Sequence, residues 1–396
     1  MRPPAVDVLV AGAGLAGVRC AESLRAAGFD GSVVVAGDEP HAPYERPPLS
    51  KELLLGTRTA SSLRQRPEGY HDGLEIVVAT SGPVRDVDLG ARRALVGDRV
   101  VRWRRLVLAT GARPRMLPGM LLGGVHVLRS LDDALGLSAE MVPGARLVVV
   151  GAGFVGAEVA SAAVALGLDV TVVEAASHPM AQVLGAEAGS RLAARMRAGG
   201  VVLRTGAAVA GLRAAGGRAT AVALRDGTVL PCDLVLVAIG AVPGADVPGC
   251  EALGRAGDGG IPTDPCGRTS HPAVWACGDV ASAWRPRIGR HRGRGHWTSA
   301  ARSARAAAHA IVGRDDTAGD EAFVWSDQFG WRIQVVGEAG GDLCAEVAEE
   351  DEAGLVIRYR DGGGRLRGGL AAGRPEALAA IRAELAVLAD VSAGVR

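Results

Sequence analysis

Two glycine-rich segments of the sequence have the spacing that dinucleotide-binding loops require. Their glycines are Gly12, Gly14 and Gly17 in the first segment and Gly151, Gly153 and Gly156 in the second. Glycines at this spacing let the backbone approach a pyrophosphate at the positive end of a helix. One such segment could serve only to pack a helix against a sheet, but two complete copies favour two nucleotide sites. The natural pair of ligands is a flavin dinucleotide and a nicotinamide dinucleotide.

An acidic residue follows each glycine segment. Asp38 lies beyond the first and Glu174 beyond the second, where a carboxylate can accept hydrogen bonds from a ribose. The charge of Glu174 favours a free 2′-hydroxyl over the 2′-phosphate of NADPH. Residues 175–180 contain no arginine or lysine that could hold that phosphate. We therefore expect the second site to bind NADH.

Each loop needs strands and a helix around it. We expect strands over 6–10, 32–36, 146–150 and 170–173, and helices that end near Ala27 and Leu166. These apolar runs, each leading into glycines and a helical pattern, are typical of βαβ units and of an α/β fold. Later expected elements are strands over 106–109, 234–237, 274–276, 332–337 and 355–360, and helices over 298–311 and 376–389.

Residues 43–51, Pro-Tyr-Glu-Arg-Pro-Pro-Leu-Ser-Lys, contain the only lysine of the 396-residue chain, Lys51. This segment resembles the FAD-contacting loop of the NADH-dependent ferredoxin reductases of bacterial oxygenase systems. That family is putidaredoxin-reductase-like and related to apoptosis-inducing factor. Arg46 and Lys51 could reach the flavin pyrophosphate or the isoalloxazine, where a cation stabilises the anionic reduced flavin. The alternative is that Lys51 is an exposed loop residue.

The resemblance extends along the chain. The residues that match further cofactor-binding positions of the family are Ala109, Thr110, Gly111, Arg113, Gly240, Gly278, Asp279, Trp297 and Trp325. The resemblance implies that Gly278 and Asp279 meet the ribityl and pyrophosphate part of the flavin, and that Trp325 lies near its edge. A simple Gly-Asp turn and a core tryptophan are the alternatives. The chain departs from the family pattern at Gly295, Ser299 and Val324. The resemblance therefore does not predict which surface binds the partner or how the protein adjusts the properties of the flavin.

The second glycine segment also carries residues to which the resemblance gives a role. It implies that Phe154 covers the flavin until nicotinamide displaces it, and that Glu158 orients the nicotinamide. We expect Lys51, Phe154 and Glu158 to act in catalysis by positioning and electrostatics, without covalent chemistry. A core-facing Phe154 is the alternative.

The resemblance implies a glutathione-reductase-like α/β fold, with two Rossmann-like dinucleotide-binding domains and an α/β C-terminal domain. The expected FAD-binding domain is discontinuous, comprising residues 1–112 and 235–316. The expected NAD-binding domain is 113–234, and the C-terminal domain is 317–396. The polar segment 313–319 marks the last boundary.

Composition and cysteine spacing argue against several other classes. The formal net charge of +1 does not suit a nucleic-acid-binding protein. The six cysteines show no CxxC pair and no metal-binding spacing, and residues 37–60, where related oxidases and peroxidases carry a redox cysteine, contain none. Cys277 has no partner at suitable spacing, so we interpret it as a packing residue. Without a secretory or membrane-spanning run, we expect a soluble, cytoplasmic protein with no metal.

Five arginines lie within the ten residues 285–294, inside the acid-free stretch 280–314: Arg285, Arg287, Arg290, Arg292 and Arg294. In a nearly neutral protein this local positive charge could steer an acidic 2Fe–2S ferredoxin toward the flavin. A solvated arginine-rich loop is the alternative.

The sequence thus predicts an FAD-dependent NADH:ferredoxin oxidoreductase. Hydride would pass from NADH to flavin N5, and single electrons would pass to a 2Fe–2S ferredoxin that feeds a monooxygenase or a Rieske dioxygenase. Two alternatives stay open. One is an NADH-dependent flavoenzyme that acts directly on a small molecule or on oxygen, and the other is a redox-sensing interaction protein.

Overall fold

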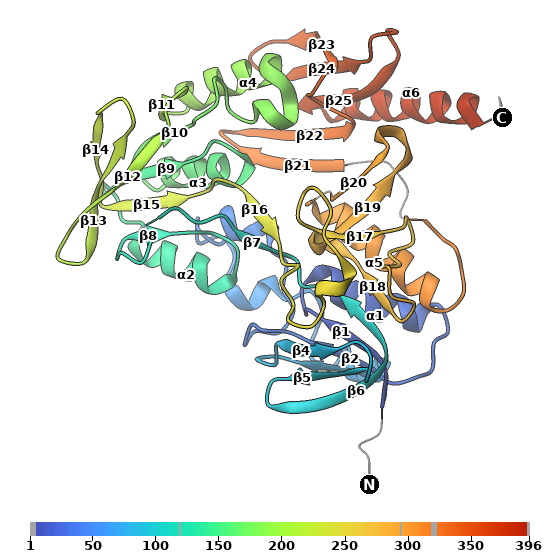
Figure 1. Ribbon diagram of the computed structural model, residues 1–396. Coiled ribbons are helices and arrows are strands. Elements are labelled where there is room, and N and C mark those ends of the chain that lie inside the picture. Colours follow the sequence, from blue (N-terminus) through green and yellow to red (C-terminus); the bar gives the residue numbers. More distant parts are fainter. Residues whose placement is uncertain (1–4, 119, 294, 318–322, 394–396) are drawn as a thin grey trace. The chain divides into compact units, whose positions relative to one another are not determined.

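The computed structural model describes residues 5–118, 120–293, 295–317 and 323–393 (Figure 1). The chain divides into two compact units. The first unit contains Met1–Glu45, Ser61–Arg113 and Ala241–Asp320, and the second contains Arg46–Ala60, Pro114–Gly240 and Glu321–Arg396.

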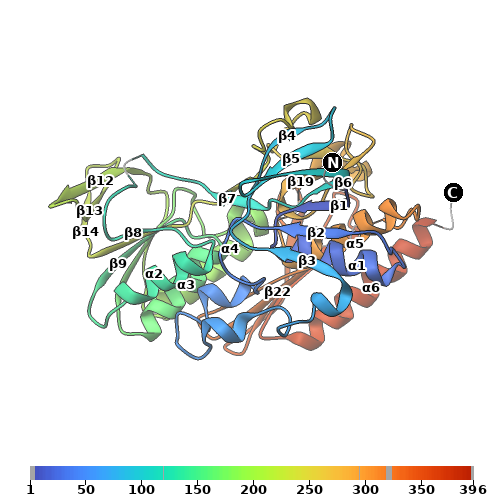
Figure 2. The same cartoon turned by 90° about the horizontal axis from the view of Figure 1, so that it is seen from below.

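A largely parallel sheet forms the centre of the first unit, in the order β3-β2-β1-β6-β5-β4, with β18 pairing β6 on a branch (Figure 2). Its strands are β1 (Val6–Ala11), β2 (Val33–Ala36), β3 (Ile76–Ala79), β4 (Val84–Asp88), β5 (Arg93–Val96), β6 (Arg99–Leu108) and β18 (Val274–Ala276). Val8, Leu9 and Val10 are all fully buried, which explains why β1 is a continuous apolar run rather than an alternating one.

Two helices of the first unit pack side by side, α1 (Leu15–Ala26) and α5 (Trp297–Ile311) (Figure 1). Fully buried alanines of α5, such as Ala304 and Ala307, share a core cluster with Leu24 of α1, and small side chains permit close approach of two helices. A separate small sheet contains β17 (Ile261–Thr263), β19 (Ala281–Arg285) and β20 (Arg290–Arg292).

The second unit contains another parallel sheet, in the order β11-β10-β9-β15-β8. Its strands are β8 (Val125–His126), β9 (Arg146–Val150), β10 (Asp169–Val173), β11 (Val202–Arg204) and β15 (Leu234–Val237). The accompanying helices are α2 (Leu131–Glu140), α3 (Phe154–Ala165) and α4 (Ala181–Ala198), and a small antiparallel sheet comprises β12 (Val209–Ala215), β13 (Arg218–Leu224) and β14 (Val229–Pro231).

The same unit ends in an antiparallel sheet with the order β21-β22-β25-β24-β23. Its elements are β21 (Phe323–Gln328), β22 (Trp331–Gly337), β23 (Cys344–Glu350), β24 (Leu355–Arg360), β25 (Leu366–Ala372) and α6 (Pro375–Ala393), which packs on β25 and β22. β21 packs against α3. One core cluster therefore joins Ile333 and Leu355 of this sheet to Leu147 and Leu192 of the parallel-sheet layer.

The predicted α/β fold with two parallel sheets is confirmed, and each predicted strand and helix is found within a few residues of its expected bounds, except that β6 begins well before residue 106. The elements that were not predicted include the helices α2 and α4 and the strands β8, β17, β19, β20, β21, β23 and β25. The sequence predicts that the first domain resumes at residue 235, whereas β15 pairs with β9 and the second unit continues to Gly240. None of the helices in the described ranges has the length and hydropathy to cross a bilayer.

Candidate active site

The first glycine loop joins β1 to α1, and each of its glycines has a different structural reason. Gly12 has a φ of +119°, and a Cβ there would lie 2.2 Å from the Ala109 oxygen. A Cβ on Gly17 would lie 1.8 Å from the Gly12 oxygen, so this position fixes the approach of the helix to the loop. A Cβ on Gly14 would meet nothing within 4 Å. The second glycine thus faces open space, as a loop that admits a pyrophosphate requires.

The second glycine loop, between β9 and α3, repeats this construction. Gly151 has a φ of +102°, and a Cβ on Gly156 would lie 2.1 Å from the Gly151 oxygen. A Cβ on Gly153 would meet nothing within 4 Å. Gly14 and Gly153 are also the N-caps of α1 and α3, and neither helix has a side-chain cap or an acid in its first turn. Both helix starts are therefore suited to a phosphate.

The acid of the second site is held firmly at the end of β10. One Glu174 oxygen accepts from the Ala152 N–H at 2.7 Å, and the other accepts from the Ala176 N–H at 2.8 Å. The carboxylate thus lies beside the glycine loop, where an adenosine ribose would bind. The Glu174 N–H donates to the carbonyl of Arg204, an exposed residue at the end of β11. Arg204 lies outside the segment 175–180 that sequence reasoning considered, because only strand pairing brings it beside Glu174.

The acid of the first site is less constrained. Asp38 is exposed just beyond β2. Its neighbour Glu39 is partly buried and accepts a hydrogen bond from the Tyr44 hydroxyl. The spacing of Asp38 in the sequence predicts it as the ribose-binding acid, and this spacing gives no sign of the Tyr44–Glu39 contact.

Several predicted cofactor residues gather at the start of α1 in the first unit. A Cβ on Gly278, which has a φ of +74°, would lie 2.7 Å from the Ala16 Cβ, so the Gly278–Asp279 turn lies against the first turn of α1. Ala109 is buried against Gly12, and the Thr110 hydroxyl donates to the Gly244 oxygen at 2.6 Å. The close approach at Gly278 explains why this turn requires glycine.

The remaining residues expected near FAD are more scattered. Gly111 has a φ of +72° and Arg113 is exposed in β7 (Ala112–Pro114). Trp297 is the first residue of α5, a helix that packs against α1 and the Gly278–Val280 turn. Trp297 is only partly buried.

Cys277 has a partner that its spacing in the sequence did not reveal. Cys20 of α1 lies beside it, and both thiols are fully buried. A hydrogen bond with the Cys20 thiol, together with burial, raises the pKa of Cys277 well above its usual value. A thiol that resists ionisation is a poor nucleophile, which agrees with a packing role for Cys277.

A buried polar cluster in the second unit joins Lys51 and Glu158, two of the three residues predicted to act in catalysis. The Lys51 Nζ lies 3.1 Å from Glu158 Oε1. Ser50 donates to Glu158 Oε2, and Ser326 donates to Oε1 at 2.6 Å. Gln328 Nε2 in turn donates to the Ser326 hydroxyl at 3.0 Å. Lys51 is only 9% exposed, so the alternative of an exposed loop lysine is wrong.

Ser50, Ser326 and Gln328 were not predicted as site residues. Ser50 lies within the proline-rich segment 43–51, and the other two lie within β21 close to Trp325, but their places in the sequence indicate no function by themselves. Trp325 stacks on Phe323, with ring centroids 6.0 Å apart. Successive side chains of a strand point to opposite faces, so Ser326 and Gln328 face away from Trp325.

Three further predicted residues lie in the second unit. The Arg46 guanidinium donates to the Arg129 backbone oxygen. Phe154 is partly buried and packs against the main core cluster of this unit, as its core-facing alternative would require. Gly240 has a φ of +94°, and its oxygen accepts from the Arg115 N–H at 2.9 Å.

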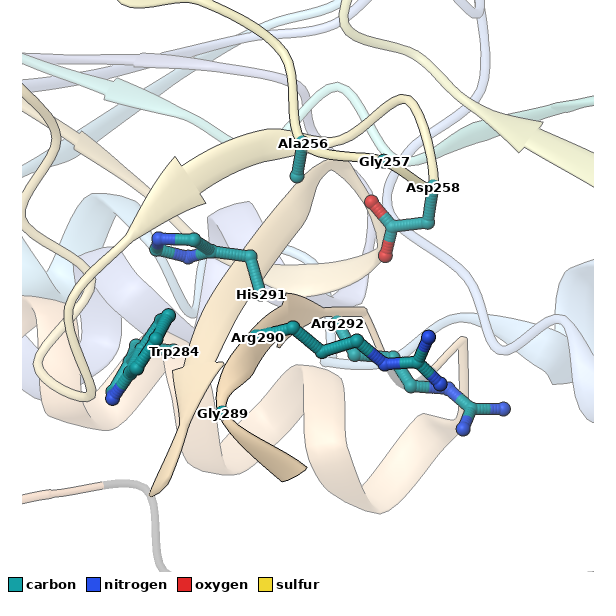
Figure 3. A pocket seen from close by; sticks show the side chains of 8 residues that line it. All are labelled: Ala256, Gly257, Asp258, Trp284, Gly289, Arg290, His291 and Arg292. Carbon is teal, nitrogen blue, oxygen red and sulfur yellow. The ribbon is translucent and has the colours of Figure 1, made fainter. Parts of the chain in front are cut away.

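The arginine-rich stretch forms the β19–β20 hairpin, which borders an open pocket of about 560 Å³ (Figure 3). The lining residues are Ala256, Gly257, Asp258, Trp284, Gly289, Arg290, His291 and Arg292. Figure 3 shows the two arginine side chains extended away from the Trp284 and His291 rings. Arg290 and Arg292 are exposed, and Arg285 is partly buried. Arg294 and the Arg287 side chain lie outside the described part of the structure.

Asp258 anchors this hairpin. It accepts hydrogen bonds from the Ser282 hydroxyl and from the N–H groups of Gly260 and Gly293. Burial acts to raise the pKa of Asp258, but these hydrogen bonds outweigh it and hold the pKa below its usual value. The Asp258 carboxylate is therefore occupied by hydrogen bonds within the protein. The exposed charge of the hairpin comes from its arginines.

Comparison with known proteins agrees with these features. The family model described as pyridine nucleotide-disulphide oxidoreductase matches residues 6–305. The chain is 35% identical over 407 residues to the chlorobenzene dioxygenase, ferredoxin reductase component, of Cupriavidus sp. (strain PS12), covering 99% of this chain and 97% of that protein. It is 34% identical over 333 residues to the rubredoxin-NAD(+) reductase of Ectopseudomonas oleovorans, covering 83% of this chain and 86% of that protein.

A solved structure is also similar over nearly the whole chain. The putidaredoxin reductase of the covalent putidaredoxin reductase–putidaredoxin complex aligns with a TM-score of 0.89 and 31% identity, covering 95% of this chain and 92% of that one. The chain therefore belongs to the pyridine nucleotide-disulphide oxidoreductase family, as an NAD(P)H-dependent flavin oxidoreductase of the ferredoxin reductase type.

Proposed function

We propose that this protein is an FAD-dependent NADH:ferredoxin oxidoreductase. When bound, FAD takes a hydride from NADH at N5 and releases electrons singly to a 2Fe–2S ferredoxin, which feeds a monooxygenase or a Rieske dioxygenase. The observation that carries the proposal is the matched pair of glycine loops, because Gly14 and Gly153 each leave open space for a pyrophosphate. Two such loops suit two dinucleotides that exchange a hydride.

We assign the first loop and its neighbours to FAD. The proposed FAD residues are Gly12, Gly14, Gly17, Asp38, Arg46, Lys51, Ala109, Thr110, Gly111, Arg113, Gly278, Asp279, Trp297 and Trp325. The packing of Gly278 on Ala16 supports this assignment, because it brings the Gly278–Asp279 turn to the helix start that would hold the pyrophosphate. The proposed NADH residues are Gly151, Gly153, Gly156, Glu174 and Gly240.

We assign the buried Lys51–Glu158 pair to the hydride-transfer step. Glu158 orients the nicotinamide carboxamide, and Lys51 supplies the cation that favours reduced flavin. Burial of two charges is costly unless they are paired, and a pair retained at such a position is a candidate for function. Phe154 lies one helical turn before Glu158, on the same face of α3, so it could cover the nicotinamide position.

We propose that the acceptor docks on the β19–β20 hairpin. Arg290 and Arg292 are exposed beside the exposed Trp284 and Ile288, and arginine with tryptophan is the composition of strong interface contacts. An acidic ferredoxin fits the charge of this surface. Rubredoxin is the second candidate acceptor, since one of the relatives is a rubredoxin-NAD(+) reductase.

The proposal includes a discontinuous FAD domain, an inserted NAD domain and a C-terminal domain. It also includes a cytoplasmic location, where the six free cysteines would stay reduced.

Anaerobic stopped-flow reduction of the FAD-reconstituted protein tests the function. We expect NADH to bleach the flavin much faster than NADPH, and the reduced protein then to reduce an oxidised 2Fe–2S ferredoxin at once. Bleaching without electron transfer to ferredoxin or rubredoxin would favour direct reduction of a small molecule or oxygen, or a redox sensor. Failure to bind FAD would refute the proposal.

A further inference from the structure

The Glu158 carboxylate is held by donors from two segments far apart in the sequence. Ser50 and Lys51 come from the proline-rich segment, and Ser326 comes from β21. The exposed fractions are 5% for Ser50, 9% for Lys51, 6% for Glu158 and 0% for Ser326. Water therefore contributes little here, and these protein groups fix the position of the carboxylate.

The hydrogen bonds from β21 have a defined direction. A serine hydroxyl has one proton, and that of Ser326 is directed to Glu158 Oε1 at 2.6 Å. The Ser326 oxygen can then only accept, and Gln328 Nε2 donates to it at 3.0 Å. A rotated Gln328 amide would present its oxygen and compete for the Ser326 proton. The order Gln328 to Ser326 to Glu158 is thus the one that satisfies all three groups, and each bond polarises the next.

This arrangement limits what Glu158 can still accept. A carboxylate has about four acceptor sites, two on each oxygen. Lys51 and Ser326 occupy Oε1, and Ser50 occupies one site of Oε2. Among the described residues no further donor reaches Glu158, so one acceptor site remains, on Oε2. A primary amide has a donor of the kind that fits this site.

We infer that Ser326 and Gln328 are positioning residues for hydride transfer: they hold Oε1 of Glu158 so that Oε2 is presented to the nicotinamide carboxamide. The inference rests on the proposed function, because it requires that Glu158 binds nicotinamide. It gives the C-terminal sheet a part in the reaction, since β21 carries both residues while packing against α3.

A matched control exists on the same two elements. The Ser161 hydroxyl of α3 accepts from the Phe329 N–H, just beyond β21, at 2.8 Å, and among the described residues the hydrogen bonds to Glu158 come from other side chains. Ser161→Ala therefore removes a hydrogen bond between the same segments without affecting the carboxylate. Ser326→Thr keeps the hydroxyl, and threonine suits a strand. Glu158→Gln tests the proposed function itself.

The experiment measures flavin bleaching by NADH at a series of concentrations, for each FAD-loaded variant, with the isotope effect from NADH deuterated at C4. We expect Ser326→Ala to lower the limiting rate by about tenfold, the size of one hydrogen bond to a charged group. The apparent dissociation constant of NADH should rise less. Gln328→Met should lower the rate by about threefold, because Ser326 can still donate to Glu158. Ser326→Thr should restore the limiting rate. Ser161→Ala should have the limiting rate of the unchanged protein, even if its melting temperature is lower.

The outcomes separate the two ideas. A slow Glu158→Gln with a normal Ser326→Ala would overturn the positioning role and leave the proposed function intact. Equal slowing in Ser326→Ala and Ser161→Ala, without rescue by Ser326→Thr, would also overturn it, since the effect would then be structural. A normal rate of flavin bleaching in Glu158→Gln would show that Glu158 takes no part in hydride transfer. The role that the proposed function gives to Glu158 would then be wrong, whatever the result for Ser326→Ala.

Discussion

The Nζ atom of Lys51 lies 3.1 Å from Oε1 of Glu158, and both side chains are buried in the second unit. An amine-reactive reagent should therefore leave Lys51 unmodified in the folded protein and modify it after unfolding in urea. Because Lys51 is the only lysine, peptide mass spectrometry reports directly on this one amine. Rapid labelling of the folded protein would show that the ion pair opens readily and would contradict the geometry.

Each glycine loop contains a glycine that faces open space, Gly14 or Gly153, and one that is tightly packed, Gly17 or Gly156. Substitution by alanine should therefore have opposite effects at the two kinds of position. Gly14→Ala and Gly153→Ala place a methyl in open space at ordinary φ values of −73° and −75°, so both variants should fold with nearly normal stability. Gly14→Ala should lose FAD affinity, whereas Gly153→Ala should keep FAD and raise the KM for NADH. Flavin content after gel filtration and steady-state kinetics measure these effects.

Gly17→Ala is the matched control for these substitutions. Its methyl would meet the Gly12 oxygen at 1.8 Å, so it should lower the free energy of unfolding by about 3 kcal/mol. If Gly14→Ala were as unstable as Gly17→Ala, the assignment of open space at Gly14 would be wrong. If Gly153→Ala lost FAD instead of NADH affinity, the two sites would have to be exchanged.

Glu174 should decide between NADH and NADPH. Glu174→Gln removes the charge that opposes a 2′-phosphate, so the ratio of kcat/KM for NADH to that for NADPH should fall by roughly tenfold. The exposed Arg204 at the end of β11 should then assist NADPH, and Arg204→Ala in the same background should reverse the gain. Asp169→Ala, at the other end of β10, is the control and should leave the ratio unchanged.

The elements around the loops could be predicted from the sequence because each is local. Runs such as 147–150 are apolar, and glycines and a helical pattern follow directly. The contacts of Glu158 could not be predicted, because Ser50 reaches it only when the segment Pro47–Ser50 packs on α3, and Ser326 reaches it only when β21 packs on α3. The same holds for Cys20 beside Cys277, which come from the first and the last of the three chain segments that form the first unit. The helix α4 is hard to predict for a different reason, since Gly185 has non-helical angles inside it.

The Arg146–Asp233 pair gives a pH-dependent stability of known sign. Hydrogen bonds from the Arg146 side chain and N–H lower the Asp233 pKa from 3.8 to about 2. Because the folded-state pKa lies below the unfolded value, the stabilisation is complete above pH 3.8 and is lost as the pH falls toward 2. The two side chains are 49% and 46% exposed, so solvent screening limits the loss in Asp233→Asn to about 1 kcal/mol or less.

Urea unfolding at several pH values measures the difference in the free energy of unfolding between Asp233→Asn and the unchanged protein. It should be present at pH 6 and should shrink below pH 4. Asp246→Asn is the control, since its side chain is 90% exposed and its nearest arginine nitrogen is 3.9 Å away. A difference that stays constant down to pH 2 would mean that the carboxylate charge is not what stabilises the fold.

The β19–β20 hairpin should affect electron transfer from the reduced flavin to ferredoxin and should not affect reduction of the flavin by NADH. Arg290→Glu with Arg292→Glu reverses two exposed charges, so the rate constant for ferredoxin reduction should fall at least tenfold at low salt, and the difference should narrow at high salt. Flavin bleaching by NADH should not change, because neither arginine belongs to the proposed nucleotide sites. Arg213→Glu with Arg225→Glu is the control, since it makes the same charge change at exposed positions of the second unit. If the two double variants slow ferredoxin reduction equally, the effect comes from net charge alone, and the acceptor does not dock on the hairpin.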